Sequence, residues 1–111
     1  MGSEKRLTML EGLTQAGKAD SFAWYALALE YKSFARIDDA LRTFRQLCEK
    51  DASYVPMYLM CGTMLGHAGR AGEAREWLER GLVKALEVGN THAAKELEEA
   101  LHALPPPPSL P

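Results

Sequence analysis

The chain has 111 residues and a mass of 12.3 kDa, which suits one small domain with a modest hydrophobic core. It holds 13 Lys and Arg residues against 15 Asp and Glu residues, so its formal net charge of −2 gives no electrostatic footprint for nucleic acid. Ala and Leu together supply more than a quarter of the chain, whereas Val and Ile occur only four times. Because Ala and Leu favour helices and β-branched residues favour strands, the composition predicts an all-α fold.

Signals for a membrane, a disulfide or a metal are missing from the sequence. No stretch of about 18 apolar residues could form a transmembrane helix, and the first six residues lack the apolar region of a signal peptide, so we expect a cytoplasmic protein without membrane contact. Cys48 and Cys61 match no zinc spacing and are expected to be small buried hydrophobic residues. His67, His92 and His102 lie too far apart for a metal site, so no metal and no cofactor are expected.

Six helices are expected in chain order. The first covers residues 4–16, where Leu7, Leu10 and Leu13 recur on one face, and it ends at Gly17. Two pairs follow, at about 21–34 and 37–51, then at about 54–68 and 73–88. Asp20 or Ser21 can cap the second helix and Ser53 the fourth. The sixth helix covers 91–104, and the prolines from residue 105 stop it.

A repeated unit runs through the middle of the chain, with a period of about 34 residues. The segments 21–54 and 55–88 share only three identical positions, but the residue classes agree much better. Small residues match small ones, as in the pairs Ala28/Gly62 and Ala40/Ala74. Two helices that cross closely need a small residue where they touch, so these four positions are expected to be helix contact points.

Both copies resemble the tetratricopeptide repeat, a helix–turn–helix unit of about 34 residues. The first copy reads Trp24-x2-Leu27-Ala28-x2-Tyr31 followed by Ala40-x3-Phe44. The second copy reads Tyr58-x2-Cys61-Gly62-x2-Leu65 followed by Ala74-x3-Leu78. The closing proline of the family is replaced by Ala52 in one copy and by Leu86 in the other.

The resemblance implies one tetratricopeptide-like domain over residues 1–104. In this organisation, residues 4–16 form a capping helix, residues 21–54 and 55–88 form two repeats, and residues 91–104 form a C-terminal helix. That last helix is apolar on one face and polar on the other, as the terminal helix of a stacked array must be. Residues 105–111 form a proline-rich tail that is expected to be extended.

In the resembled family, the first helix of each repeat lines a concave groove that holds peptides or partner helices. Carried over by the repeat spacing, this groove would contain Phe22, Tyr25, Ala26, Leu29, Lys32, Leu59, Met60, Thr63 and His67. The set is mostly apolar, and it lacks the Asn and most of the basic residues with which some relatives bind a C-terminal carboxylate. We therefore expect an apolar peptide or an amphipathic helix as the partner.

The leading interpretation is a non-catalytic protein–protein interaction module. The alternative is a structural protein that self-associates through the same surface, because two repeats bury less apolar surface than the usual three or more. Under these two interpretations the chain is a monomer or a weak homodimer. In a variant of this alternative, the groove is filled by the terminal segments of the chain itself.

An enzyme is not expected. The only catalytic motif is a near match to a phosphate-binding loop at residues 12–19. In it, Ala19 replaces the Ser or Thr that should ligate magnesium, and the residues before the loop have the pattern of a helix, where such a loop needs a β-strand.

Overall fold

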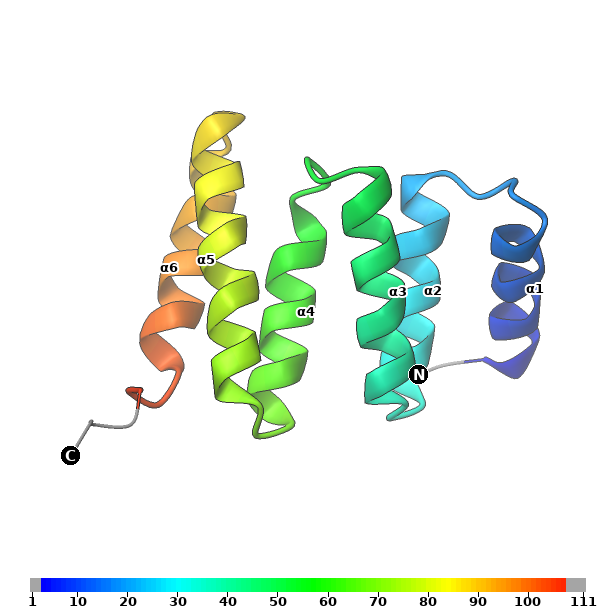
Figure 1. Ribbon diagram of the computed structural model, residues 1–111, viewed down its shortest axis with the longest axis horizontal. Coiled ribbons are helices and arrows are strands. Elements are labelled where there is room, and N and C mark those ends of the chain that lie inside the picture. The colour runs from blue at the N-terminus through cyan, green and yellow to red at the C-terminus, as the bar shows by residue number, and fades with distance from the viewer. Residues whose placement is uncertain (1–2, 108–111) are drawn as a thin grey trace. The chain divides into compact units, whose positions relative to one another are not determined.

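A computed structural model describes residues 3–107, which form six α-helices and no strand (Figure 1). The all-α prediction is therefore confirmed. The helices are α1 (Glu4–Gln15), α2 (Ser21–Ser33), α3 (Ile37–Lys50), α4 (Pro56–His67), α5 (Ala71–Glu87) and α6 (Thr91–Ala103). They fall into two compact units, Met1–Met57 and Tyr58–Pro111. In the first unit α2 packs against both α1 and α3, and in the second α5 packs against α6.

Helix boundaries repeat with the period that the sequence predicts. α2 ends at Ser33 and α4 ends at His67, while α3 begins at Ile37 and α5 begins at Ala71. The two hairpins differ at their far ends, because α5 has 17 residues and α3 has 14. The longer helix continues through Leu86, where the closing proline of a repeat would have interrupted it.

The turns inside the two hairpins are closed by the same hydrogen bonds. The amide of Arg36 donates to the carbonyl oxygen of Tyr31 at 2.9 Å, and at the equivalent place in the second hairpin the amide of Arg70 donates to that of Leu65 at 2.9 Å. A hydrogen bond from an amide to the carbonyl oxygen five residues earlier, together with the shorter hydrogen bond nested inside it, forms the Schellman motif that closes a helix C-terminus. The closure requires a left-handed residue immediately before each arginine.

Ala35 and Gly69 occupy this left-handed position, with φ angles of 59° and 79°. Glycine adopts positive φ without penalty, whereas the Cβ of an L-residue there comes too close to the following carbonyl oxygen. The first hairpin therefore makes the same turn as the second with a residue that strains it.

Exchanging the residues at these two turns should change stability in opposite directions. We expect Ala35→Gly to raise the free energy of unfolding by about 0.5–1 kcal/mol and Gly69→Ala to lower it by a similar amount, since relief of the left-handed strain exceeds the extra chain entropy of glycine. Urea unfolding followed by circular dichroism measures both. Ala100→Gly inside α6 is the control and should be destabilising, and a stabilising effect of Gly69→Ala would contradict the argument.

The predicted contact points are confirmed as places of close helix packing. Ala28, Ala40 and Ala74 are fully buried. A Cβ added to Gly62 would lie 2.5 Å from the side chain of Leu78, so α4 and α5 approach each other too closely there for a larger residue without repacking.

The second hairpin has a further close contact that the first does not have. A Cβ at Gly81 would lie 2.4 Å from the Cβ of Tyr58 and 3.0 Å from Leu97. The equivalent position in the first hairpin is Leu47, which is fully buried. The two hairpins share a backbone plan but fill their cores differently.

Several local expectations are corrected by the structure. The fourth helix was expected from about residue 54, with Ser53 as its cap, but α4 begins at Pro56. The hydroxyl of Ser53 donates to a carboxylate oxygen of Asp51 at 3.2 Å. α5 begins at Ala71, slightly earlier than the sequence indicated. Cys61 is buried as expected, but Cys48 is only partly buried, because it lies at the edge of the apolar stripe of α3.

The described part of the tail, residues 105–107, is exposed and non-helical, as expected. Leu104 has the extended backbone that precedes proline, and the carbonyl oxygen of Pro105 accepts a hydrogen bond of 2.7 Å from Arg75. Residues 108–111 of the predicted tail lie outside the described residues. Across residues 3–107, none of the helices combines the length and the hydropathy needed to cross a bilayer, and no group of three or more His, Cys, Asp and Glu side chains is placed to hold a metal ion.

Candidate functional site

The nine residues predicted to line a groove lie on two helices. Five are on α2 and belong to the first unit, and four are on α4 and belong to the second. We call the first set the α2 face; it comprises Phe22, Tyr25, Ala26, Leu29 and Lys32. We call the other the α4 set; it comprises Leu59, Met60, Thr63 and His67.

The α2 face is a continuous strip because its members recur at intervals of three and four residues. Asp20 starts the helix by accepting a hydrogen bond of 2.8 Å from the amide of Ala23, which is the role of an N-cap. Phe22, two residues after the cap, has 65% of its surface exposed. The other members are partly buried, so the strip presents apolar surface at the molecular boundary of this unit.

Tyr25 is held in place by two other aromatic rings. Its ring centroid lies 5.3 Å from that of Tyr54 and 6.5 Å from that of Phe44, which is fully buried. Burial raises the pKa of the Tyr25 hydroxyl, and the neighbouring Tyr54 raises it further. Tyr25 thus joins the α2 face to the core of its unit.

The N-terminal end of α2 is also acidic. Asp51, directly after α3, accepts a hydrogen bond of 2.7 Å from the hydroxyl of Ser21 at the start of α2. Burial raises the pKa of the Tyr54 hydroxyl, and the charges of Asp20 and Asp51 raise it further. The comparison of the two repeats missed Tyr54 and Asp51 as neighbours of the α2 face, because they lie in the connection between hairpins, where helical periodicity gives no signal.

The α4 set is partly covered by the end of its own unit. The hydroxyl of Thr63 donates to the carbonyl oxygen of Leu59 at 2.8 Å, so it is already satisfied within α4. Thr63 and the exposed His67 line a cavity of about 170 Å³ together with Leu104 and Pro105, which follow α6. At this end the α4 set therefore shares its surroundings with the residues that follow α6.

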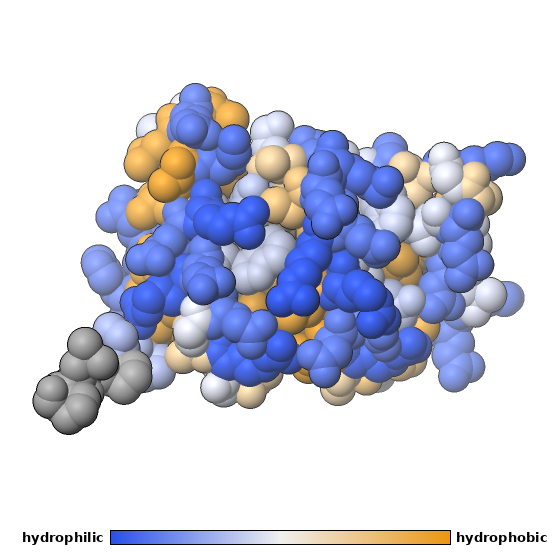
Figure 2. All heavy atoms as spheres, viewed as in Figure 1, coloured by the Kyte–Doolittle hydropathy of each residue, from blue (hydrophilic) through white to orange (hydrophobic). Residues whose placement is uncertain are grey.

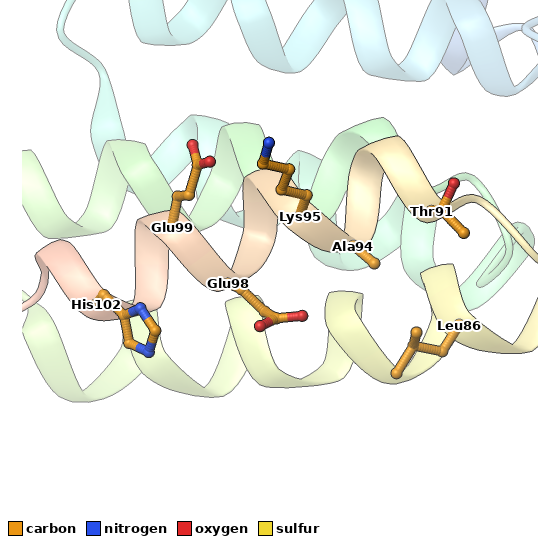
Figure 3. Close-up of a pocket in the computed structure, with 7 residues that line it drawn as sticks. All are labelled: Leu86, Thr91, Ala94, Lys95, Glu98, Glu99 and His102. Atoms are coloured by element: carbon orange, nitrogen blue, oxygen red, sulfur yellow. The ribbon is translucent and has the colours of Figure 1, made fainter.

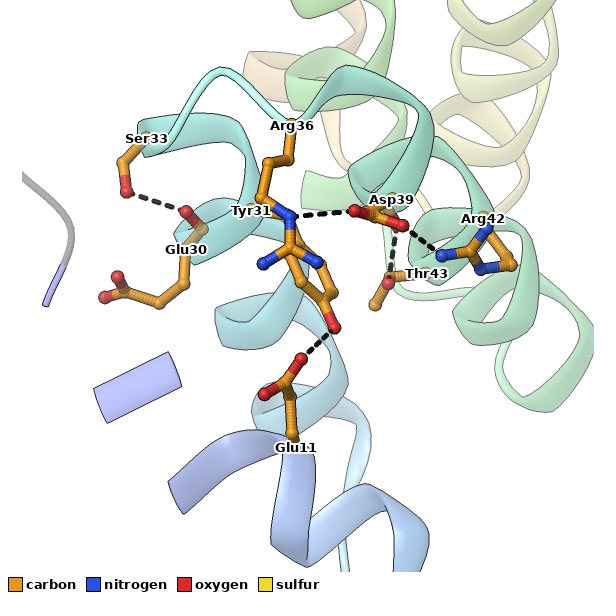
Figure 4. A network of polar contacts seen from close by, with 8 residues as sticks. All are labelled: Glu11, Glu30, Tyr31, Ser33, Arg36, Asp39, Arg42 and Thr43. Atoms are coloured by element: carbon orange, nitrogen blue, oxygen red, sulfur yellow. Dashed lines mark hydrogen bonds and ion pairs between the residues drawn. The ribbon is translucent and has the colours of Figure 1, made fainter. Parts of the chain in front are cut away.

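A polar network connects α2 to the helices on either side of it (Figure 4). The hydroxyl of Tyr31 on α2 donates to Glu11 on α1 at 2.6 Å, and burial together with this hydrogen bond raises the pKa of Tyr31 to about 12. The guanidinium of Arg36 lies 4.6 Å from the Tyr31 ring centroid and pairs with Asp39 on α3 at 2.8 Å. Asp39 also pairs with Arg42.

Glu30 fastens the start of α1 to α2. Its carboxylate is almost completely buried, and it accepts hydrogen bonds from the Arg6 guanidinium at 2.7 Å and from the Ser3 amide at 3.1 Å. The hydrogen bond from Arg6 lowers the pKa of Glu30, although burial acts in the opposite direction. A buried carboxylate is tolerated here because both donors approach it.

Glu30→Gln should make the protein less stable at neutral pH and less sensitive to acid. The folded pKa of Glu30 lies below its unfolded value of about 4.3, so its stabilisation is present above that value and is lost as the pH falls through the folded pKa. We expect a loss of roughly 1–2 kcal/mol at pH 7, shrinking towards zero at low pH. Urea unfolding at a series of pH values measures this, with the exposed Glu49→Gln as control. An equal loss at pH 7 and pH 3 would contradict it.

Trp24 and Tyr58 hold equivalent positions in the two hairpins but differ in burial. Tyr58 is buried, with its ring centroid 6.0 Å from that of Trp77, which is also buried. Trp24 is partly exposed and lines a cavity of about 260 Å³ between α1, α2 and α3. The ammonium of Lys50 lies 5.2 Å from the centroid of its ring.

The outer side of α6 carries polar residues at the positions where a repeat has its packing residues. His92, Lys95, Glu96 and Glu99 stand one repeat length after Tyr58, Cys61, Gly62 and Leu65. Lys95 and Glu99 are among the residues that line a depression of about 440 Å³ along α6, together with Leu86 of α5. Figure 3 shows both side chains extending from α6 on the side away from Leu86. This side of α6 lacks the small and apolar residues against which another hairpin would pack.

The near match to a phosphate-binding loop is the end of a helix. Gly12 lies within α1, and Gly17 has a φ angle of 70° in the turn that closes it. The amides of Gly17 and Lys18 donate to the carbonyl oxygens of Thr14 and Leu13. These amides are therefore engaged within the turn, whereas a phosphate-binding loop must point its amides at the ligand.

Comparison with known proteins gives solved structures of the same architecture. The crystal structure of a tetratricopeptide repeat domain protein from Salinibacter ruber is 31% identical, over 76% of this chain and 93% of its own, with a TM-score of 0.68. A solution structure of a tetratricopeptide repeat domain protein from the same organism is 31% identical, over 75% and 84%, with a TM-score of 0.70.

The solution structure of a protein from Bordetella parapertussis is 25% identical, over 92% of this chain and 87% of its own, with a TM-score of 0.76. No family model and no curated protein sequence matches the chain. The identity to the Salinibacter ruber protein extends over nearly all of that protein and agrees with the repeated motif and the repeated helix boundaries. The chain belongs to the tetratricopeptide repeat family.

Proposed function

We propose that this protein binds a peptide or an amphipathic helix of a partner protein through the apolar residues of the α2 face. Helical repeat modules of this family generally take part in protein–protein interaction and are typically non-catalytic. The proposal adds to this general role a particular surface and an apolar partner.

The exposure of Phe22 carries the proposal. A phenylalanine with 65% of its surface exposed would be more favourably placed in a core, and here it stands on a helix whose opposite side is already packed against α1 and α3. Ala26 and Leu29 continue the apolar surface along the same strip, and Lys32 is its only charged member. Such a lining favours an apolar peptide over a free carboxylate.

Phe22→Glu should abolish capture of a partner without unfolding the protein. The substitution places a charge at the most exposed apolar residue of the proposed contact, and because residue 22 lies in the first turn of α2, a carboxylate there is favourable to the helix. Affinity capture from the native lysate, with wild type beside the variant, measures the effect. Met9→Glu on α1 is the matched control, since Met9 is 57% exposed and lies outside the α2 face.

Capture that is unchanged by Phe22→Glu would contradict the proposal, as would equal losses in Phe22→Glu and Met9→Glu. Circular dichroism must first show the same helicity for all three proteins. Tyr25→Glu is a poorer test, because its ring packs on Phe44 and Tyr54 and its loss would disturb the core.

A second candidate function is self-association. Val83, Leu86 and Val88 are all more than half exposed, and Figure 2 shows apolar surface at the C-terminal end of α5 in the second unit. Light scattering at two protein concentrations should then give a mass that rises with concentration, and Leu86→Glu should return it to the monomer value. A monomer at both concentrations removes this candidate.

A further inference from the structure

We propose that the partner segment bound by the α2 face carries a lysine or arginine beside its apolar residues, and that this basic side chain docks at the N-terminal end of α2. The docking place, here called the acidic end, consists of Asp20, Tyr25, Asp51 and Tyr54. The inference rests on the proposed function and adds the chemistry of the partner to it.

Aromatic rings at the acidic end offer a surface for a cation. Tyr25 and Tyr54 are tilted by 52° with their ring centroids 5.3 Å apart. A lysine or arginine head group is attracted to the face of such rings, and arginine also packs its planar group against them. Phe22, one turn before Tyr25 on the same helix, is exposed, so the apolar stem of a basic side chain would also find contact there.

The carboxylates at the acidic end accept hydrogen bonds from uncharged groups. Asp20 accepts from the amide of Ala23, and Asp51 accepts from the hydroxyls of Ser21 and Ser53. All of these donors are uncharged, so the hydrogen bonds hold the two carboxylates in position and no cation takes part in them.

The basic residue that adjoins Asp51 in sequence lies over an aromatic ring of α2. Lys50 immediately precedes Asp51, but its ammonium lies 5.2 Å from the ring centroid of Trp24. Along α2 the charge then changes sign, because Lys32 is the only charged residue of the α2 face and stands near the helix C-terminus. A bound segment would match this polarity with a basic residue at the acidic end and apolar residues along Ala26 and Leu29.

Selection from a phage library of random dodecapeptides tests the inference without a known partner. The targets are the wild-type protein, the double variant Asp20→Asn/Asp51→Asn, and the control Glu76→Gln/Glu79→Gln on α5, which changes the net charge equally. Asparagine at position 20 can still cap α2, and asparagine at position 51 can still accept a hydrogen bond from the hydroxyl of Ser21. The fold should therefore be kept, and circular dichroism verifies this.

We expect wild type and control to select apolar peptides enriched in lysine or arginine, and the double variant to select apolar peptides without that enrichment. A selected basic peptide should bind the double variant roughly 3- to 30-fold more weakly than wild type. Three outcomes would overturn the inference and leave the proposed function standing. Wild type could select apolar peptides without basic residues, it could select acidic peptides, or the basic enrichment could persist in the double variant. If no peptide is enriched over an unrelated protein surface, the proposed function itself fails.

Discussion

The structure depends on the close approach of the two helices within each hairpin. Helices whose axes come this near can touch only where one of them has a side chain of one carbon or none, and Ala28 and Gly62 are the residues that permit it. Large side chains on either side of the contact then fill the remaining space, as Phe44 and Leu78 do. The second repeat uses the same arrangement as the first, and it fixes α2 against α3 and α4 against α5.

Much of the fold could be predicted from the sequence because this constraint leaves a pattern of small and large residues. The period located α2 and α4, and Gly17 marked the end of α1, where the backbone is left-handed. Ala35 shows the limit of such reasoning. Its left-handed backbone could be inferred only from its alignment with Gly69, since alanine by itself favours a continuing helix.

The surroundings of the candidate site could be predicted less well, because they depend on contacts between residues without a periodic relation. Helical spacing identified the α2 face, but it gave no sign that Tyr54 and Asp51 stand at its N-terminal end. Glu30 is a similar case. A glutamate in an apolar helix suggests an exposed position, yet Glu30 is buried and accepts hydrogen bonds from Arg6 and Ser3. Such pairings are decided by how α1 meets α2, which a single sequence does not encode locally.

The contacts around α2 also bear on how well it could bind a partner. A flexible surface loses conformational entropy when it is ordered by a ligand, and this loss weakens binding. Here Tyr31 and Glu30 fix α2 against α1, and Tyr25 is packed on Phe44, so the helix and most of its exposed strip are ordered before any ligand arrives. Phe22 is the member of the strip left most exposed, and its burial by a partner would add apolar contact with little further ordering.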